Sequence, residues 1–177
     1  MSDSGRLARR VALDGMLFAL AVVMSVVDGM IPVPVPGVRL GLSNIAVMYA
    51  LFFVGRRDAL TLAALKGLFA FVTRGVTAGA MSLSGGLLSV LVMTLLTVVF
   101  GKRVSYTMLS VAGALAHNAG QMIVVKFIYS SLTLSAFAPV LVISGIAAGV
   151  ATAAILRAFL PVAKRFGEDW LDKNFPE

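Results

Sequence analysis

Long apolar stretches, separated by short basic or glycine-containing turns, run through the whole 177-residue chain. A helix needs about 20 mainly apolar residues to cross a bilayer, and stretches near that length recur throughout the sequence. The pattern predicts an all-α integral membrane protein in which residues 1–177 form a single transmembrane domain. The six predicted transmembrane helices cover about residues 8–30, 42–55, 58–74, 81–100, 104–129 and 137–160.

The segments between these helices have their own signatures. Residues 31–37 read IPVPVPG, and the alternating prolines favour an extended loop after the first helix. Residues 74–80 contain glycine and are predicted to form a connection, and Pro161 is predicted to end the sixth helix. Phe166 and Trp170 follow among charged residues, so residues 161–177 are predicted to form an amphipathic tail at the membrane surface.

The distribution of charge also indicates a membrane protein. Only 13% of the residues are charged, against about 25% in a typical soluble domain. The net charge is +7, but the basic residues flank apolar stretches, as the positive-inside rule describes, so no nucleic-acid partner is expected. With six crossings, only Arg39 and Arg74 lie on the side away from the termini. Both termini are therefore predicted to be cytoplasmic, in the cytoplasmic membrane of a prokaryote. Eleven basic residues lie on the side of the termini: Arg6, Arg9, Arg10, Arg56, Arg57, Lys102, Arg103, Arg157, Lys164, Arg165 and Lys173.

Composition and motifs exclude several kinds of chemistry. The absence of cysteine excludes disulfides, iron–sulfur ligation and thiol catalysis. One histidine and eight acidic residues leave little material for a metal site, and no cofactor is expected. The sequence has no phosphate-binding P-loop, no serine beside the histidine and no aspartate-rich motif for magnesium diphosphate. No catalytic residue is therefore assigned, and this chain alone is not expected to be an enzyme.

The fifth predicted helix carries polar residues in its middle. His117, Asn118 and Gln121 lie there, and His117 is the single histidine of the chain. Polar groups are costly inside a bilayer and usually face the interior of a helix bundle or a water-filled cavity. His117 and Gln121 are four residues apart and share one helix face. The spacing predicts a polar seam in the bundle, although these side chains could instead serve only as hydrogen-bond links between helices.

Other polar residues fall near the outer ends of the predicted helices, and Lys66 lies deeper, in the third helix. Lysine, arginine and the free N–H groups of helix starts suit a carboxylate, a phosphate or a polar ring, so an outward-opening pocket is predicted. The alternatives are that the arginines lie among lipid headgroups and that Lys66 pairs with an aspartate of the first helix. Lys126 lies about 180° around its helix from His117 and is expected to point outward. Asp28 and Ser82 are also expected near the outer helix ends. The predicted ligand-binding residues are Arg39, Asn44, Lys66, Arg74, Ser84, His117, Asn118 and Gln121.

Four stretches carry a resemblance to a known family: VRLGLSNIAVMYALFFVGRRDAL, SLSGGLLSVLVM, VAGALAHNAGQMIVV and LVISGIAAGV. They resemble the Gx transporter family, which is also labelled heptaprenyl diphosphate synthase component I. The resemblance covers about residues 30–154, and its most specific parts are GLSNI, in which Ser43 replaces the usual alanine, and AHNAGQ. It implies pocket-lining roles for Asn44, His117, Asn118 and Gln121.

The family is similar to the substrate-binding S components of energy-coupling-factor transporters. That similarity implies a bundle of six helices with an outward pocket, and a long loop after the first helix. S components use small residues on the first helix to meet the coupling subunit, and Ala8 and Ala12 have the matching spacing here. The resemblance also implies an association of this chain with flavin- or quinone-linked membrane redox proteins.

The leading hypothesis is a membrane substrate-binding or transport protein whose ligand is a vitamin, flavin, or quinone or isoprenoid precursor. Its partner would be an energy-coupling module. The alternative is a non-transporting scaffold for a prenyl diphosphate synthase or for a flavin- or quinone-linked redox complex. A weaker third hypothesis is an enzyme acting on a membrane isoprenoid, with His117 as acid or base.

Overall fold

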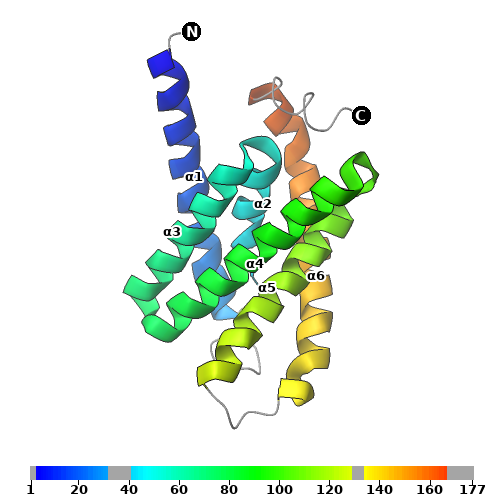
Figure 1. Ribbon diagram of the computed structural model, residues 1–177. Coiled ribbons are helices and arrows are strands. Elements are labelled where there is room, and N and C mark those ends of the chain that lie inside the picture. Colours follow the sequence, from blue (N-terminus) through cyan, green and yellow to red (C-terminus); the bar gives the residue numbers. More distant parts are fainter. Residues whose placement is uncertain (1–2, 32–40, 129–133, 167–177) are drawn as a thin grey trace.

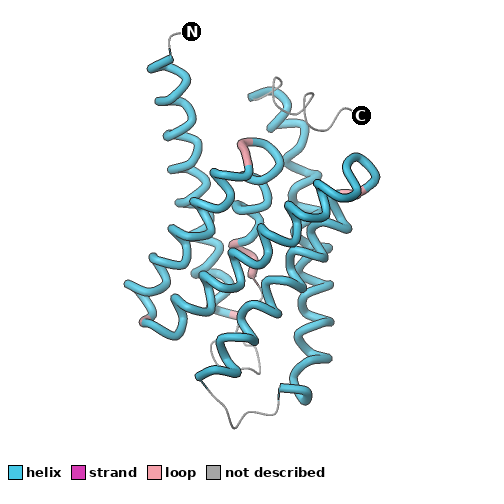
Figure 2. The backbone as a smooth tube through the Cα atoms, viewed as in Figure 1, coloured by secondary structure: helices cyan, strands magenta, loops and turns pink. Residues whose placement is uncertain are grey.

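The computed structural model describes residues 3–31, 41–128 and 134–166. Within these residues the chain is helical and contains no strand, which confirms the predicted all-α class for this part (Figure 2). The elements in chain order are α1 (Asp3–Met30), α2 (Asn44–Phe53), α3 (Arg56–Arg74), α4 (Val76–Phe100), the 3₁₀ turn η1 (Gly101–Arg103), α5 (Tyr106–Ile128) and α6 (Leu134–Phe166).

Consecutive helices run in opposite directions, so α1 begins and α6 ends at the same end of the bundle (Figure 1). The helix α4 packs most extensively against α3 and α5, and α5 packs in turn against α6. Gly145 and Gly149 of α6 form a GxxxG close-packing motif that serves this last interface, because Gly149 faces the backbone of Val111 and Gly145 faces Leu115, both in α5. The close-packing motif is therefore used inside one chain.

The short helix α2 lies at the centre of the packing. It contacts α1, α3, α4 and α6, and eight of its ten residues are buried. Phe52 packs edge-to-face on Tyr106 of α5, with ring centroids 5.3 Å apart. Because α2 is enclosed on several sides, its first residue, Asn44, is held inside the bundle at 7% exposure.

The outside of the bundle is covered by large apolar side chains, including Val72 and Phe127, which are 87% and 84% exposed. Such a surface suits lipid and would be unfavourable in water. Four helical segments are long and apolar enough to cross a membrane: Arg10–Met30, Val76–Phe100, Tyr106–Ile128 and Phe137–Ala158. The ten residues of α2 span only about 15 Å, and α3 contains five charged residues, including Lys66 at its centre. The helices thus fit a membrane protein, and six crossings stay a prediction.

Two predicted boundaries are wrong. Residues 76–80 belong to α4, and Gly75 alone separates α3 from α4. Gly75 has φ of 88°, a left-handed conformation that glycine adopts at no steric cost, so one residue is enough to reverse the chain. Pro161 does not end α6, which continues to Phe166. A proline removes one backbone hydrogen bond, and a long apolar helix can continue through that loss. The predicted loop at residues 31–37 and the tail at 161–177 lie largely outside the described residues.

Candidate functional site

Lys66 is the most deeply buried cation among the described residues. It lies at the middle of α3 and is 2% exposed. Its Nζ donates a hydrogen bond of 2.6 Å to Oδ1 of Asn44, the first residue of α2. The hydrogen-bond partner of Lys66 is therefore a neutral amide, while Asp28 of α1 lines the same cavity and acts on Lys66 through its charge.

His117 of α5 lies next to this pair, in a space shaped by two glycines. A Cβ atom added at Gly85 of α4 would lie 2.7 Å from the His117 Nδ1, and one added at Gly41 would lie 2.8 Å from its Cδ2. Real Cβ atoms do not approach other atoms so closely. The imidazole, 3% exposed, therefore fits only because both neighbours lack a side chain.

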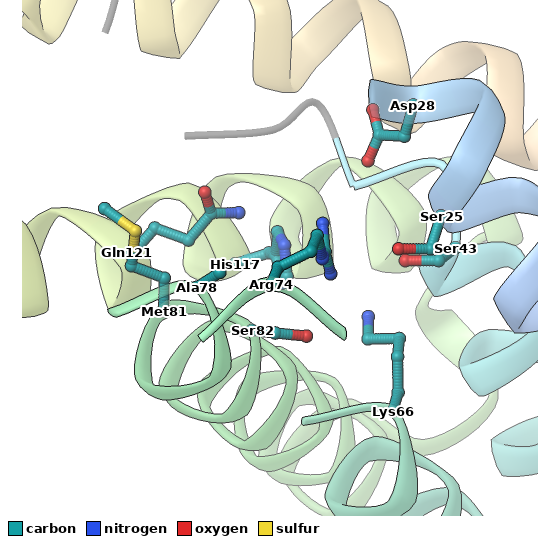
Figure 3. Close-up of a pocket in the computed structure, with 10 residues that line it drawn as sticks. All are labelled: Ser25, Asp28, Ser43, Lys66, Arg74, Ala78, Met81, Ser82, His117 and Gln121. Carbon is teal, nitrogen blue, oxygen red and sulfur yellow. The ribbon is translucent and has the colours of Figure 1, made fainter. Parts of the chain in front are cut away.

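Lys66 and His117 line a small cavity of about 20 Å³. Figure 3 shows the hydroxyl groups of Ser25, Ser43 and Ser82 and the amine of Lys66 directed toward one another. The lining comes from α1, α3, α4, α5 and the residue before α2: Ser25, Asp28, Ser43, Lys66, Arg74, Ala78, Met81, Ser82, His117 and Gln121. A water molecule needs roughly 10–15 Å³ by the same measure, so the cavity is water-sized in this conformation.

The charges of the lining are unequal. Lys66 and Arg74 are cationic, and Asp28 is anionic, so the formal excess is one positive charge. Asp28 is 1% exposed, and its Oδ2 accepts a hydrogen bond of 2.9 Å from the backbone N–H of Gly41. The cavity therefore offers hydroxyl and amide groups around a net positive charge, inside an apolar bundle.

A family model described as heptaprenyl diphosphate synthase component I matches residues 17–159, from the middle of α1 to the last part of α6. The chain belongs to this family. The match confirms the family label that the sequence motifs suggested. The description names one component of a synthase. No curated protein and no solved structure matches the chain.

The fold brings together only some of the predicted ligand-binding residues. Lys66, Arg74, His117 and Gln121 line the cavity, and Asn44 is bonded to Lys66 at its edge. Arg39 lies outside the described residues. In the part of the chain that the structure describes, the chain offers no group of three or more histidine or acidic side chains that could hold a metal ion.

Two predicted residues point elsewhere. Asn118 donates from Nδ2 to the Leu141 carbonyl of α6 at 2.8 Å, so it forms an interhelical link. Ser84 donates to the Gly120 carbonyl of α5 at 2.8 Å. Lys126 is exposed, as expected from its helix face. Ala8 and Ala12 are exposed on α1, where a partner helix can reach them.

Sequence reasoning missed Ser25 and Ser43 as members of the cavity in this family member. Ser25 lies three residues before Asp28 on α1 and therefore shares its helix face. That spacing could have placed Ser25 beside Asp28 in the predicted pocket. Ser43 precedes α2, and its hydroxyl adds a hydrogen-bonding group to the lining.

Proposed function

We propose that this chain is a membrane-embedded binding protein that captures a small anion in the Lys66 cavity and transports it in the manner of an S component. The observation that carries the proposal is the full burial of Lys66 beside Asn44, with Arg74 lining the same space. Charged groups inside a membrane bundle are costly and usually mark an ion or substrate pathway.

The charge of the lining favours a ligand with one net negative charge. A single carboxylate or singly charged phosphate would neutralise the excess of one positive charge from Lys66, Arg74 and Asp28. A diphosphate would leave uncompensated negative charge in a poorly solvated interior, which costs free energy. The hydroxyls of Ser25, Ser43 and Ser82 suit further polar atoms of the ligand. These features support a vitamin, flavin, or quinone or isoprenoid precursor that carries an acid group.

Ligand capture requires the bundle to open. Sites for small organic molecules usually enclose about 300–1,000 Å³, whereas the Lys66 cavity is about 20 Å³. The described conformation is therefore the closed one in this proposal. The short helix α2 and the charged helix α3, which meet at the Asn44–Lys66 hydrogen bond, are the elements whose separation would enlarge the site.

The membrane topology in this proposal has six crossings and cytoplasmic termini. The antiparallel helix order brings the start of α1 and the end of α6 to one end of the bundle, and the start of α3 at Arg56–Arg57 and the 3₁₀ turn η1 with Lys102–Arg103 lie at that end (Figure 1). Such a concentration of basic residues supports a cytoplasmic location for that end. The short α2 would then cross only part of the bilayer, inside the protein.

The test is native mass spectrometry of protein purified in mild detergent, with Lys66→Met and Lys126→Met compared. Both variants lose one lysine, but only Lys66 lines the cavity, since Lys126 is exposed on α5. Wild type and Lys126→Met should retain a small acid that Lys66→Met lacks. Adding that acid should raise the melting temperature of wild type, because a ligand that binds only the folded state stabilises it. Retention of the same molecule by Lys66→Met would refute the proposed site.

A second candidate function is a docking subunit for a prenyl diphosphate synthase, because the family description names a synthase component. Exposed Ala8 and Ala12, near the projecting start of α1, are candidate contact positions for the partner (Figure 1). Affinity purification from native membranes separates the two functions. Recovery of a synthase subunit without a coupling ATPase would support docking, and recovery of the ATPase module would refute it.

A further inference from the structure

Asn44 stands between two cavities. Lysine can only donate hydrogen bonds, so the contact with Lys66 Nζ fixes Oδ1 as the amide atom on that side. The Nδ2 of Asn44 is then the remaining donor, and it has no hydrogen-bond partner among the described residues. Asn44 also lines a second cavity of about 10 Å³, formed by α2, α4, α5, α6 and Gly41.

The second cavity contains another polar atom without a partner. Ser89 of α4 is 1% exposed, and its Oγ makes no hydrogen bond within the described part of the chain. Ser110 and Thr152 also line the space, and the Ser110 hydroxyl already donates to the Gly149 carbonyl at 2.7 Å. Two buried polar groups that face one space without partners are unfavourable, and ordered water commonly satisfies such groups.

We propose that one ordered water molecule occupies this cavity, accepts a hydrogen bond from Asn44 Nδ2 and donates one to Ser89 Oγ. The volume of about 10 Å³ is at the lower limit for one water. A metal cation is disfavoured because the Asn44 amide directs N–H groups into the space. A chloride ion is larger than water and would not fit without displacing lining residues such as Met48 or Met93.

The water site extends the polar interior beyond the Lys66 cavity. Ser110 and His117 are seven residues, about two turns, apart on α5 and share one face, so the two cavities lie in series along that helix. The second cavity is nearer the end where α1 begins. The water would hold the Asn44 amide in the orientation that presents Oδ1 to Lys66. This inference stands whether or not the protein transports a ligand.

Radiolytic oxidation with mass spectrometry tests the site on wild-type protein in detergent. Hydroxyl radicals formed from a bound water oxidise the side chains that touch it, and methionine reacts readily. Met48 and Met93 are 2% and 1% exposed, so bulk water does not reach them. Met81, 2% exposed beside the Lys66 cavity, is the internal reference for a buried methionine next to water-sized space. We expect Met48 and Met93 to be oxidised together with Met81.

Ser89→Val provides the matched variant, because valine removes the hydroxyl and fills the cavity. Thr94→Val on the same helix is the control, since Thr94 does not line the space. Oxidation of Met48 and Met93 should fall several-fold in Ser89→Val and stay unchanged in Thr94→Val. Equal oxidation in Ser89→Val and wild type would overturn the proposal. If Ser89→Val does not fold, wild type alone decides: oxidation of Met81 without Met48 and Met93 would show that the second cavity is dry.

Discussion

The contact between α4 and α5 depends on the absence of a side chain at Gly120. A Cβ atom built there would lie 2.7 Å from the Ser84 carbonyl oxygen and 2.8 Å from the Gly85 Cα. Both are backbone atoms of α4 and cannot rotate away. We therefore predict that Gly120→Ala destabilises the protein by forcing the two helices apart near the level of the Lys66 cavity.

The size of the effect follows from these distances. Ordinary van der Waals contact begins at 3.4 Å, so the helices must separate by about 0.7 Å at the 2.7 Å contact. Overfilling a well-packed interface usually costs about 1–3 kcal/mol. The gain in helix propensity from glycine to alanine is about 1 kcal/mol and offsets part of that cost. The expected net loss is about 1–2 kcal/mol, because the obstacle is backbone and the cost lies at the upper end.

Gly15→Ala is the matched control for this substitution. Gly15 lies inside α1, is exposed and has no neighbour within 4 Å of a built Cβ. Alanine there should leave stability unchanged or raise it, by at most about 1 kcal/mol. Reversible unfolding of both variants in mixed detergent micelles gives the comparison. A Gly120→Ala protein as stable as Gly15→Ala would show that the close approach of α4 and α5 does not hold the bundle together.

Three further predictions concern single polar contacts. Ser84→Ala should cost only about 0.6 kcal/mol in the same assay, the typical value for a hydrogen bond between membrane helices, because the interhelical bond that it loses goes to the Gly120 carbonyl and its other, longer bond goes to the Met81 carbonyl of its own helix. A loss as large as that of Gly120→Ala would contradict this. Arg10 bonds Asp58 through both Nε and Nη2, and a double-mutant cycle on the pair should give about 0.5–1 kcal/mol that falls with added salt, since the Arg10 side chain is 52% exposed. A salt-independent coupling would contradict this prediction, which rests on the solvent contact of the Arg10 end of the pair, since Asp58 is only 8% exposed. His117→Ala should lose the retained ligand in native mass spectrometry while Asn118→Ala keeps it, because only His117 lines the cavity; equal loss in both would contradict the assignment.

The sequence predicted the helical class and the polar seam because both follow from local patterns. Apolar stretches of sufficient length define α1, α4, α5 and α6. The four-residue spacing of His117 and Gln121 places them on one face, and both line the cavity. Asn118, one residue after His117, is rotated by about 100° around the helix. It therefore contacts α6 and does not line the Lys66 cavity, although it directly follows His117 in the sequence.

The central role of α2 was not predictable from the sequence alone. Its ten residues are apolar and short, and nothing local distinguishes a partial span from a fully enclosed helix. Enclosure depends on which helices surround it, and that is decided by packing between segments far apart in the chain. The hydrogen bond between Asn44 and Lys66 joins residues 22 positions apart, so it becomes visible only when α2 and α3 are placed together.

Lys66 and Arg10 show how differently two cations can be used in one bundle. Arg10 is half exposed in the first part of α1 and forms an ion pair with two hydrogen bonds, so its charge costs little free energy. Lys66 is 2% exposed, and its hydrogen bond goes to a neutral amide. Removing an ammonium group from water costs several kcal/mol, and one bond to an uncharged acceptor recovers only part of this. A methionine would fill the same volume without that cost. Asp28 lines the same cavity and offsets one positive charge, but Arg74 adds another. The proposed anion would neutralise the remaining positive charge, which a stability argument alone leaves without a role.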